Sequence, residues 1–215
     1  MNLSKRLHSI ADMIPSDSRV IDVGCDHALL SIYLEKEKNC TCIAADINDN
    51  ALESARINKK KYNSNIEIVL TDGINNIDIK SDDYIVIAGM GTTTINHILN
   101  NKILSNNLVL ASNNQIYELR KMVISLGYII QDEKFVCDHQ KKYVIIKFVK
   151  GKKKYSNIDM KYGPILKNNS QYLIYELEKI FDIKEKIKNS NFHVRYKNQR
   201  EINKIKKMID KIQGE

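Results

Sequence analysis

The stretch Val20-Ile-Asp-Val-Gly-Cys-Asp-His-Ala28 carries the most information about the fold of this chain. A short run of Val and Ile that ends in an acid and a glycine is typical of a strand followed by a tight turn into a helix. At such a turn Gly24 lets the backbone pass close under a ligand, and the Asp22 carboxylate can bind an ammonium group. The turn lacks the glycine pattern G-x-G-x-x-G of dinucleotide sites, and no G-x-x-x-x-G-K-[ST] loop occurs in the sequence. The sequence therefore disfavours NAD and nucleoside triphosphates as ligands.

Short apolar runs alternate with helical patterns on both sides of this stretch, through residue 149. The predicted strands are residues 19–23, 41–45, 66–70, 83–88, 108–112, 129–137 and 143–149. The predicted helices are an amphipathic helix within residues 1–15 and residues 28–36, 48–62, 94–99 and 116–126. This alternation predicts an α/β fold with a parallel sheet covered on both faces, closed by an antiparallel hairpin of the last two strands. That is the outline of the class I (Rossmann-like) methyltransferase sheet.

The pattern changes after residue 149. Residues 150–163 are charged and end in a Gly-Pro pair, which predicts a linker. Two helices should follow, from about Pro164 to Lys188 and from about Val194 onward, and Ile202, Ile205, Ile209 and Ile212 form a coiled-coil seam on the second. We expect a methyltransferase-like domain over residues 1–150 and a C-terminal helical hairpin (coiled coil) over residues 151–215.

Composition and charge narrow the function classes. The chain has 215 residues, 43% hydrophobic and 28% charged, which argues against a disordered chain. It has no apolar run of membrane-spanning length and no signal peptide, so we predict a cytoplasmic protein. The four cysteines lack zinc spacing, so we expect buried free thiols and no metal.

The basic residues concentrate in the C-terminal segment. Residues 1–149 hold 17 basic and 18 acidic residues, and residues 150–215 hold 17 basic and 8 acidic. This asymmetry favours a polyanion partner such as RNA or DNA, or an anionic membrane surface. Lysine-rich codon usage and a solvated dimerisation or capping hairpin are the alternatives.

Two further acids follow the next two predicted strands. Asp46 ends the second, where a carboxylate can accept both hydroxyls of a ribose. Asp72 and Gly73 follow the third, where the acid can accept an adenine amino group. Turn formation explains Asp and Gly singly, but ligand binding better explains three acids at one sheet edge. With the flexible segment Ala88-Gly-Met-Gly91 after the fourth strand, the pattern predicts S-adenosylmethionine as cofactor, although a tight turn is the alternative for that segment.

These residues also carry a family resemblance. The chain resembles the bacterial TrmK family, tRNA (adenine-N1) methyltransferases that act on the adenine at position 22, in Leu3-Ser-Lys-Arg-Leu7 with Ile14-Pro15, Asp22-Val-Gly-Cys-Asp-His-Ala28, Asp72-Gly73 and Ile87-Ala-Gly-Met-Gly91. The resemblance runs over nearly the whole chain. Relatives usually have Ser or Thr at Cys25, a Glu near Asp46, a second Gly at Thr92, and Gln-Pro-Asn at residues 111–113.

The resemblance implies transfer of a methyl group from S-adenosylmethionine to N1 of this adenine. The cofactor-binding residues that we expect are Arg6, Asp22, Gly24, Asp26, His27, Asp46, Ile47, Asp72, Gly73, Ala88, Gly89, Met90 and Gly91. Because the methyl donor is already activated, positioning should dominate and no strong base is required. The candidate catalytic residues are Asp26, His27 and Asn113, although Asp26 could instead cap a helix and His27 could be structural.

The resemblance also implies a tRNA partner. We expect phosphate contacts from Lys152, Lys153, Lys154, Arg195, Lys197, Arg200 and Lys204. The alternatives are methylation of another RNA or of a small molecule, or a non-catalytic RNA-binding protein on a methyltransferase scaffold. We predict no membrane partner, no obligate protein partner, and a monomer or weak dimer.

Overall fold

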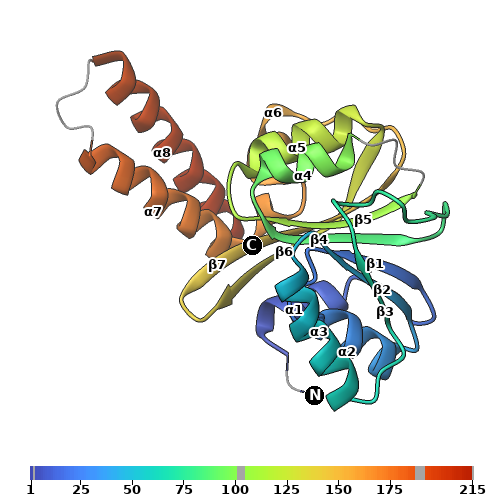
Figure 1. Ribbon diagram of the computed structural model, residues 1–215. Helices are drawn as coiled ribbons and strands as arrows, with labels where there is room; N and C mark the ends of the chain where they lie inside the picture. The colour runs from blue at the N-terminus through green and yellow to red at the C-terminus, as the bar shows by residue number, and fades with distance from the viewer. Residues whose placement is uncertain (2, 101–104, 187–191, 215) are drawn as a thin grey trace. The chain divides into compact units, whose positions relative to one another are not determined.

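The computed structural model describes residues 1, 3–100, 105–186 and 192–214 of the chain (Figure 1). Within these ranges the side chains of residues 184–186, 192–195 and 197 are outside the described part. The chain divides into two compact units, Met1–Lys154 and Tyr155–Glu215.

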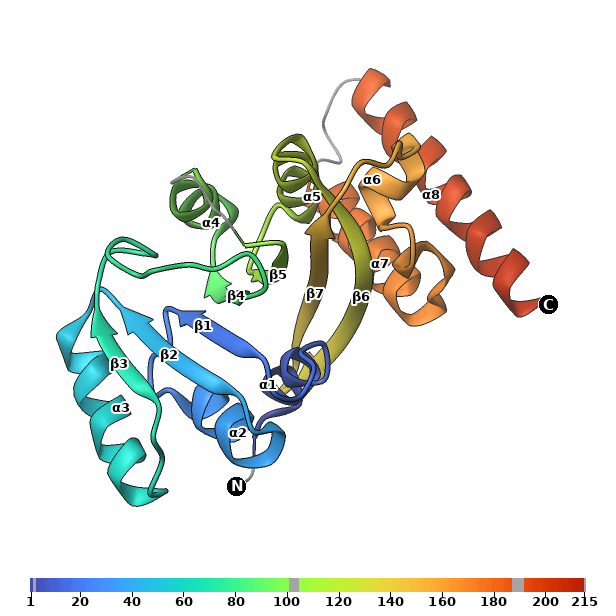
Figure 2. The same cartoon turned by 90° about the vertical axis from the view of Figure 1, so that its right-hand side faces the viewer.

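The first unit is built on a seven-stranded sheet with the strand order β3-β2-β1-β4-β5-β7-β6 (Figure 2). The strands are β1 (Arg19–Val23), β2 (Thr41–Asp46), β3 (Glu67–Leu70), β4 (Tyr84–Met90), β5 (Asn107–Ser112), β6 (Tyr128–Asp138) and β7 (Lys141–Lys150). The first five are parallel, whereas β7 runs antiparallel to β5 and β6. The predicted strands and the closing hairpin are confirmed. The strand order reverses between β1 and β4, which is where sheets of this kind bind ligands.

Five helices cover the two faces of this sheet. Figure 1 shows α1 (Lys5–Ala11), α2 (Leu29–Lys38) and α3 (Asp49–Lys61) on one face, and α4 (Thr92–Leu99) and α5 (Ile116–Ser125) on the other. Alternation along the strands explains this burial, since successive side chains point to opposite faces. Val20, Cys42, Ala44 and Val86 belong to the core beneath α1, α2 and α3. Asp22 shares the face of Val20, so its carboxylate points into this core layer rather than into solvent.

All four cysteines are free, as predicted from the sequence. Cys25, Cys40 and Cys42 are buried, but Cys137 is exposed on the β6–β7 hairpin, so the prediction of burial is wrong at that position. Burial raises the pKa of the Cys25 thiol, with the negative charges of Asp22 and Asp46 adding to the effect. Cys25 is therefore a neutral packing residue beneath the β1–α2 turn.

The second unit is helical. It contains α6 (Asn157–Tyr162), a short 3-10 helix η1 (Leu166–Asn168), α7 (Ser170–Lys186) and α8 (Phe192–Gln213). Helices α7 and α8 pack against each other and form the predicted hairpin. The core of the unit includes Tyr162, Leu173, Ile202 and Ile205, so the first half of the predicted isoleucine seam is buried.

Two details of this unit differ from the sequence predictions. The predicted linker contains α6, because Ser156 and Asp159 form a reciprocal capping box that starts a helix there. The next long helix begins at Ser170 and not at Pro164, because the Asn169 side chain accepts the Tyr172 N–H at 2.9 Å and caps it. Its predicted end at Lys188 lies outside the described residues. Among the described helices, none is long and apolar enough to cross a membrane.

Candidate active site

The β1–α2 turn requires glycine at position 24. Gly24 has φ +73°, and a Cβ atom there would lie 2.1 Å from Cε of Met90 at the end of β4. The Gly24 and Cys25 N–H groups both donate to the Ala45 carbonyl, at 2.8 and 3.1 Å, which joins this turn to β2. The carboxyl ends of β1, β2 and β4 thus meet around Gly24, as the sequence predicted for a ligand site.

Asp22 is a buried carboxylate beneath this turn. Its Oδ2 accepts a hydrogen bond from the Ser31 hydroxyl of α2 at 2.8 Å. Burial raises the pKa of Asp22 to about 6 and the nearby Asp46 charge adds to it, whereas the Ser31 hydrogen bond and the Arg6 charge lower it. A cationic group bound nearby would relieve this cost, because it favours the ionised carboxylate.

Asp46 is held by two backbone donors. Its Oδ1 accepts the Asn48 N–H at 2.9 Å, and its Oδ2 accepts the Asp26 N–H at 3.2 Å. The side chain is half-buried, so each oxygen keeps acceptor capacity toward solvent. Asp46 is therefore prepared to accept two hydroxyl groups of a ligand.

The end of β3 adds an exposed acid and an apolar surface. Asp72 is exposed, and Gly73 beside it has φ +64° and packs against Ile98. Ile47, next to Asp46, is one of the most exposed large apolar side chains of this unit. The Thr71 N–H donates to the Asp46 carbonyl at 2.9 Å and joins the two strand ends. This combination suits a nucleobase, which offers an apolar face and polar edge.

The end of β4 is tied to the turn after β5. Gly89 has φ +88°, and its carbonyl accepts a hydrogen bond from the Asn113 side-chain amide at 2.7 Å. The Asn113 N–H donates to the Met90 carbonyl at 2.9 Å. Next to it, Asn114 Oδ1 accepts the Thr92 N–H at 3.1 Å and caps α4, whose own N-cap residue Gly91 has no side chain. Ala88, Gly89 and Met90 are thus the end of β4, with an irregularity in its pairing with β5 between Ala88 and Met90, so the prediction that this segment follows the strand is wrong. Asn113 is exposed beside it.

Arg6 reaches this edge from α1. Its Cζ lies 5.2 Å from the centre of the Tyr143 ring on β7. Its Nη1 would lie 3.3 Å from a Cβ atom at Gly89, so the absence of a side chain there leaves room for the guanidinium. The Arg6 charge also lowers the pKa of Asp22. The structure therefore brings Arg6, Asp22 and Gly89 together.

Asp26 and His27 are exposed on the β1–α2 turn. Asp26 Oδ2 and His27 Nε2 are 3.6 Å apart, and the His27 carbonyl accepts a hydrogen bond from the Asn58 side chain at 3.0 Å. The alternative interpretation of Asp26 as the N-cap of α2 is wrong, since Ala28 occupies that position with φ +53° and has no capping side chain. The Asp26 contribution that the structure shows is its N–H, which orients Asp46.

The candidate RNA-binding residues divide between the units. Lys152, Lys153 and Lys154 are exposed at the end of the first unit. On α8, the Arg200 guanidinium lies 5.9 Å from the Tyr196 ring centre, and the Lys204 ammonium lies 5.9 Å from that of Tyr162. The side chains of Arg195 and Lys197, also on α8, lie outside the described ones.

Three residues that orient parts of the site were not predicted from the sequence. Ser31, Asn114 and Tyr143 orient Asp22, the β4–α4 turn and Arg6, respectively. The contact between Ser31 and Asp22 could have been predicted, because Ser31 lies on the helix that directly follows the turn. The contact between Tyr143 and Arg6 could not, since it depends on how the hairpin folds back on α1.

The donor set fits S-adenosylmethionine. Buried Asp22 supplies the negative charge that an ammonium group requires, and Asp46 supplies two oriented acceptors for ribose hydroxyls. Arg6 supplies a cation for a carboxylate beside an open glycine position. Among the described residues, no group of His, Cys, Asp and Glu could hold a metal ion.

Comparison with known proteins agrees with this geometry. Residues 3–146 match the family model described as a methyltransferase domain. MG248 of Mycoplasma genitalium, assigned as a tRNA methyltransferase, is 35% identical over 157 residues, which are 70% of this chain and 72% of that protein. The tRNA (adenine(22)-N(1))-methyltransferase of Bacillus subtilis is 33% identical over 153 residues, 68% of this chain and 64% of its own.

A solved structure extends the likeness to both units. M. capricolum TrmK, determined with the cofactor product S-adenosylhomocysteine, matches with a TM-score of 0.84 and 32% identity, over 98% of this chain and 99% of that one. Fold, site and family model together define this protein as a class I methyltransferase. The chain belongs to the TrmK family of tRNA methyltransferases.

Proposed function

We propose that this chain transfers a methyl group from S-adenosylmethionine to N1 of adenine 22 in tRNA. The observation that carries this function is the pair of oriented acids, Asp22 and Asp46, at the strand ends beside the glycine turn of β4. Membership of the TrmK family supports the choice of substrate, because the Bacillus subtilis relative is named for this reaction.

The residues at the strand ends hold the cofactor. Asp46 accepts the ribose hydroxyls, and Ile47, Asp72 and Gly73 surround the adenine. Asp22 and Arg6 bind the amino and carboxyl groups of the amino-acid end. The remaining contacts with the cofactor are made by the backbone of Gly24, Asp26, His27, Ala88, Gly89, Met90 and Gly91. When bound, S-adenosylmethionine supplies a methyl group on a sulfonium, which needs no further activation.

Asn113 orients the acceptor base. Its side-chain N–H₂ already donates to the Gly89 carbonyl, which leaves its Oδ1 to accept from the exocyclic amino group of the adenine. N1 then lies in a fixed direction from this contact. N1 is neutral and nucleophilic, and the amino group becomes acidic only after methylation, so no strong base is required. Asn113 is therefore a stronger candidate than Asp26 or His27 for direct contact with the reacting base.

The basic residues bind the tRNA backbone. Residues 150–215 contain 17 basic and 8 acidic residues, and Arg200 is exposed on α8. Lys152, Lys153, Lys154, Arg195, Lys197, Arg200 and Lys204 contribute phosphate contacts that hold folded tRNA by charge and shape. N1 lies on the Watson–Crick edge, so adenine 22 must be unpaired or extruded before transfer.

Primer extension on tRNA tests this function. A methyl group on N1 blocks Watson–Crick pairing, so reverse transcription should stop beside position 22 after incubation with protein and S-adenosylmethionine. Omission of the cofactor should remove the stop. Stops at another position would assign a different target base, and their absence at every position would favour a small-molecule methyltransferase or a non-catalytic RNA-binding protein.

A further inference from the structure

An acid far from the cofactor turn caps the helix that carries Arg6. Asp138 ends β6, and its Oδ2 accepts the Arg6 N–H at 3.1 Å across 132 positions of sequence. Ser4 and the Lys5 N–H lie near this carboxylate as well and help to lower its pKa. Burial opposes ionisation of Asp138, but the Arg6 N–H, Ser4, the His139 charge and the Lys5 N–H together outweigh it and hold its pKa below the usual range. Asp138 is thus an ionised, nearly buried acceptor at the N-terminus of α1.

Helix α1 depends on such a partner. It has only seven residues and no acid in its own first turn. Short helices are marginal alone, and the free N–H groups of a first turn require acceptors and favour a negative charge. The Ser4 hydroxyl accepts the Leu7 N–H at 3.4 Å, and Asp138 accepts the Arg6 N–H at 3.1 Å. The first turn of α1 is therefore fixed by the β6–β7 hairpin.

The same hairpin holds the other end of Arg6. Tyr143 of β7 lies under the guanidinium, with 5.2 Å from Cζ to the ring centre. Arg6 is thus anchored to one hairpin at its backbone by Asp138 and at its side chain by Tyr143. Between these anchors its Nη1 faces the open position at Gly89, beside Asp22.

We propose that Asp138 is a positioning residue for methyl transfer: it fixes the first turn of α1 so that Arg6 can bind the carboxylate of the cofactor. This inference rests on the proposed cofactor role of Arg6. Asp138 itself contacts no reacting group. Its effect on cofactor binding must therefore pass through Arg6.

A double-mutant cycle tests this coupling by titration calorimetry with S-adenosylhomocysteine. We expect Arg6→Ala to weaken binding at least tenfold and Asp138→Ala about five- to tenfold. The double variant should match Arg6→Ala within twofold, because Asp138 has no other route to the cofactor. Asp138→Asn should bind between wild type and Asp138→Ala, because its amide oxygen still accepts one N–H group.

Asp12→Ala is the matched control. Asp12 also joins α1 to β6, through an ion pair of 3.1 Å with Lys134, but at the opposite end of the helix. Its removal should leave cofactor affinity unchanged. Additive losses in the double variant, or equal losses in the Asp12 and Asp138 variants, would overturn the inference. If Arg6→Ala binds like wild type, the proposed role of Arg6 fails as well; if only Asp138→Ala does, the positioning role alone fails.

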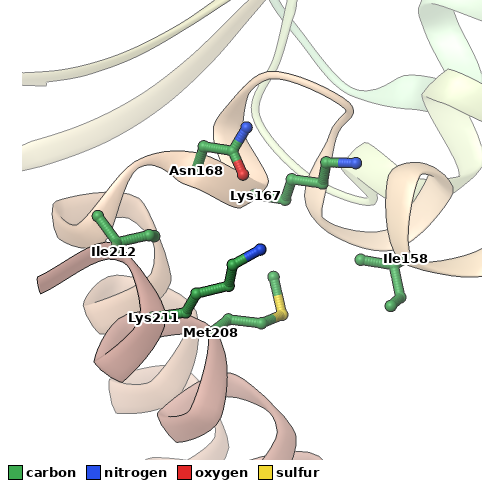
Figure 3. A pocket seen from close by; sticks show the side chains of 6 residues that line it. All are labelled: Ile158, Lys167, Asn168, Met208, Lys211 and Ile212. Atoms are coloured by element: carbon green, nitrogen blue, oxygen red, sulfur yellow. The ribbon is translucent and has the colours of Figure 1, made fainter. Parts of the chain in front are cut away.

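A separate observation concerns a cavity within the helical unit. It measures about 510 Å³ and is lined by residues of α6, η1 and the C-terminal part of α8, namely Ile158, Lys167, Asn168, Met208, Lys211 and Ile212 (Figure 3). Figure 3 shows Met208 and Lys211 extending from α8 toward Lys167. Lys167 pairs with Asp159 at 2.7 Å, whereas Lys211 forms no ion pair with any described residue. The cavity therefore combines an apolar wall with an available ammonium group.

The geometry points to this cavity as a docking site for one ribose-phosphate unit of the tRNA. Lys211 supplies the charge for the phosphate, and Ile158 and Ile212 supply apolar contact for the sugar. The excess of basic residues in this segment complements a polyanion. The inference rests on tRNA being the substrate, and it assigns one contact within that larger interface.

Lys211→Gln tests the cavity, and Lys206→Gln is its control. Lys206 is exposed on the same helix, about 140° from Lys211 around the helix axis. Lys206→Gln therefore removes the same charge at a position that faces away from the cavity. Lys211→Gln should weaken tRNA binding three- to tenfold and lower the salt slope by about one phosphate contact, with little effect from Lys206→Gln. Equal losses of tRNA affinity in the two variants would mean that Lys211 acts only through the general positive charge of the helix, and would overturn the assignment of the cavity. A Lys211→Gln variant that binds tRNA normally but changes the sedimentation of the protein alone would assign the cavity to a second copy. Failure of the wild type to bind tRNA would instead overturn the proposed function.

Discussion

Replacement of Asp46 is the most informative perturbation of the cofactor site. In the structure both of its oxygens accept backbone N–H groups, from Asn48 and Asp26. Asp46→Ala removes the proposed acceptor of both ribose hydroxyls and also releases these two donors. Asp46→Asn should be nearly as damaging, because an amide presents its NH₂ to one of the two N–H groups.

The size of the effect follows from the hydrogen bonds that the ribose hydroxyls could no longer donate. Hydrogen bonds to a charged group contribute about 1.5–3 kcal/mol, and because Asp46 is half-buried and water screens its charge, we assign this range to the two hydroxyls together. A total loss of about 1.5–3 kcal/mol weakens cofactor binding roughly 10- to 150-fold. Titration calorimetry with S-adenosylmethionine measures this affinity directly, and thermal unfolding checks that the fold survives.

Asp49→Ala controls for the loss of charge. Asp49 lies three positions further on, is exposed, and pairs with Arg56 at 3.1 Å on the surface of α3. Its removal should leave the affinity within twofold of wild type. If Asp46→Ala also stays within twofold of wild type, Asp46 is only a turn residue and the ribose assignment is refuted.

Four further predictions follow from the site geometry. Since the pKa of Asp22 is about 6 and an ammonium group favours the ionised form, cofactor affinity should fall about tenfold between pH 7 and pH 5, and Asp22→Asn should abolish this dependence in calorimetry. Gly24→Ala should lose cofactor binding in the same assay and lower the unfolding temperature, because the new Cβ meets Met90 at a strained φ. Asn113→Ala should lower kcat in a methylation assay and leave cofactor affinity unchanged, and an affinity loss would place Asn113 in the cofactor site instead. Deletion of residues 155–215 should preserve cofactor binding and abolish most tRNA binding in a filter assay, whereas retained tRNA affinity would exclude this unit as the docking element.

The placement of three acids at one edge of the sheet could be predicted from sequence, because each follows an apolar run. Asp22, Asp46 and Asp72 end or follow three successive strands, and the carboxyl ends of parallel strands share one edge. The strand boundaries could also be predicted, because runs of Val and Ile mark the strands. These signals are local in sequence, and the parallel topology converts them into spatial neighbours.

The supports of the site could not be predicted in this way. Asp138 caps α1 from 132 positions away, and its register depends on the irregular pairing of β6 with β7. No periodicity connects the two segments. The errors in the helical unit had a different origin, because their signals were present. Ser156 with Asp159, and Asn169, are helix-capping residues at the observed starts of α6 and α7.

Nucleoside mass spectrometry on a defined tRNA shows directly whether this protein methylates N1 of adenine 22. Two unmodified transcripts that differ only in adenine or guanine at position 22 would be incubated with the protein and S-adenosylmethionine, then digested to nucleosides. We expect 1-methyladenosine from the adenine-22 transcript and none from its guanine-22 counterpart. Equal 1-methyladenosine from both transcripts, or none from either, would contradict the proposed function.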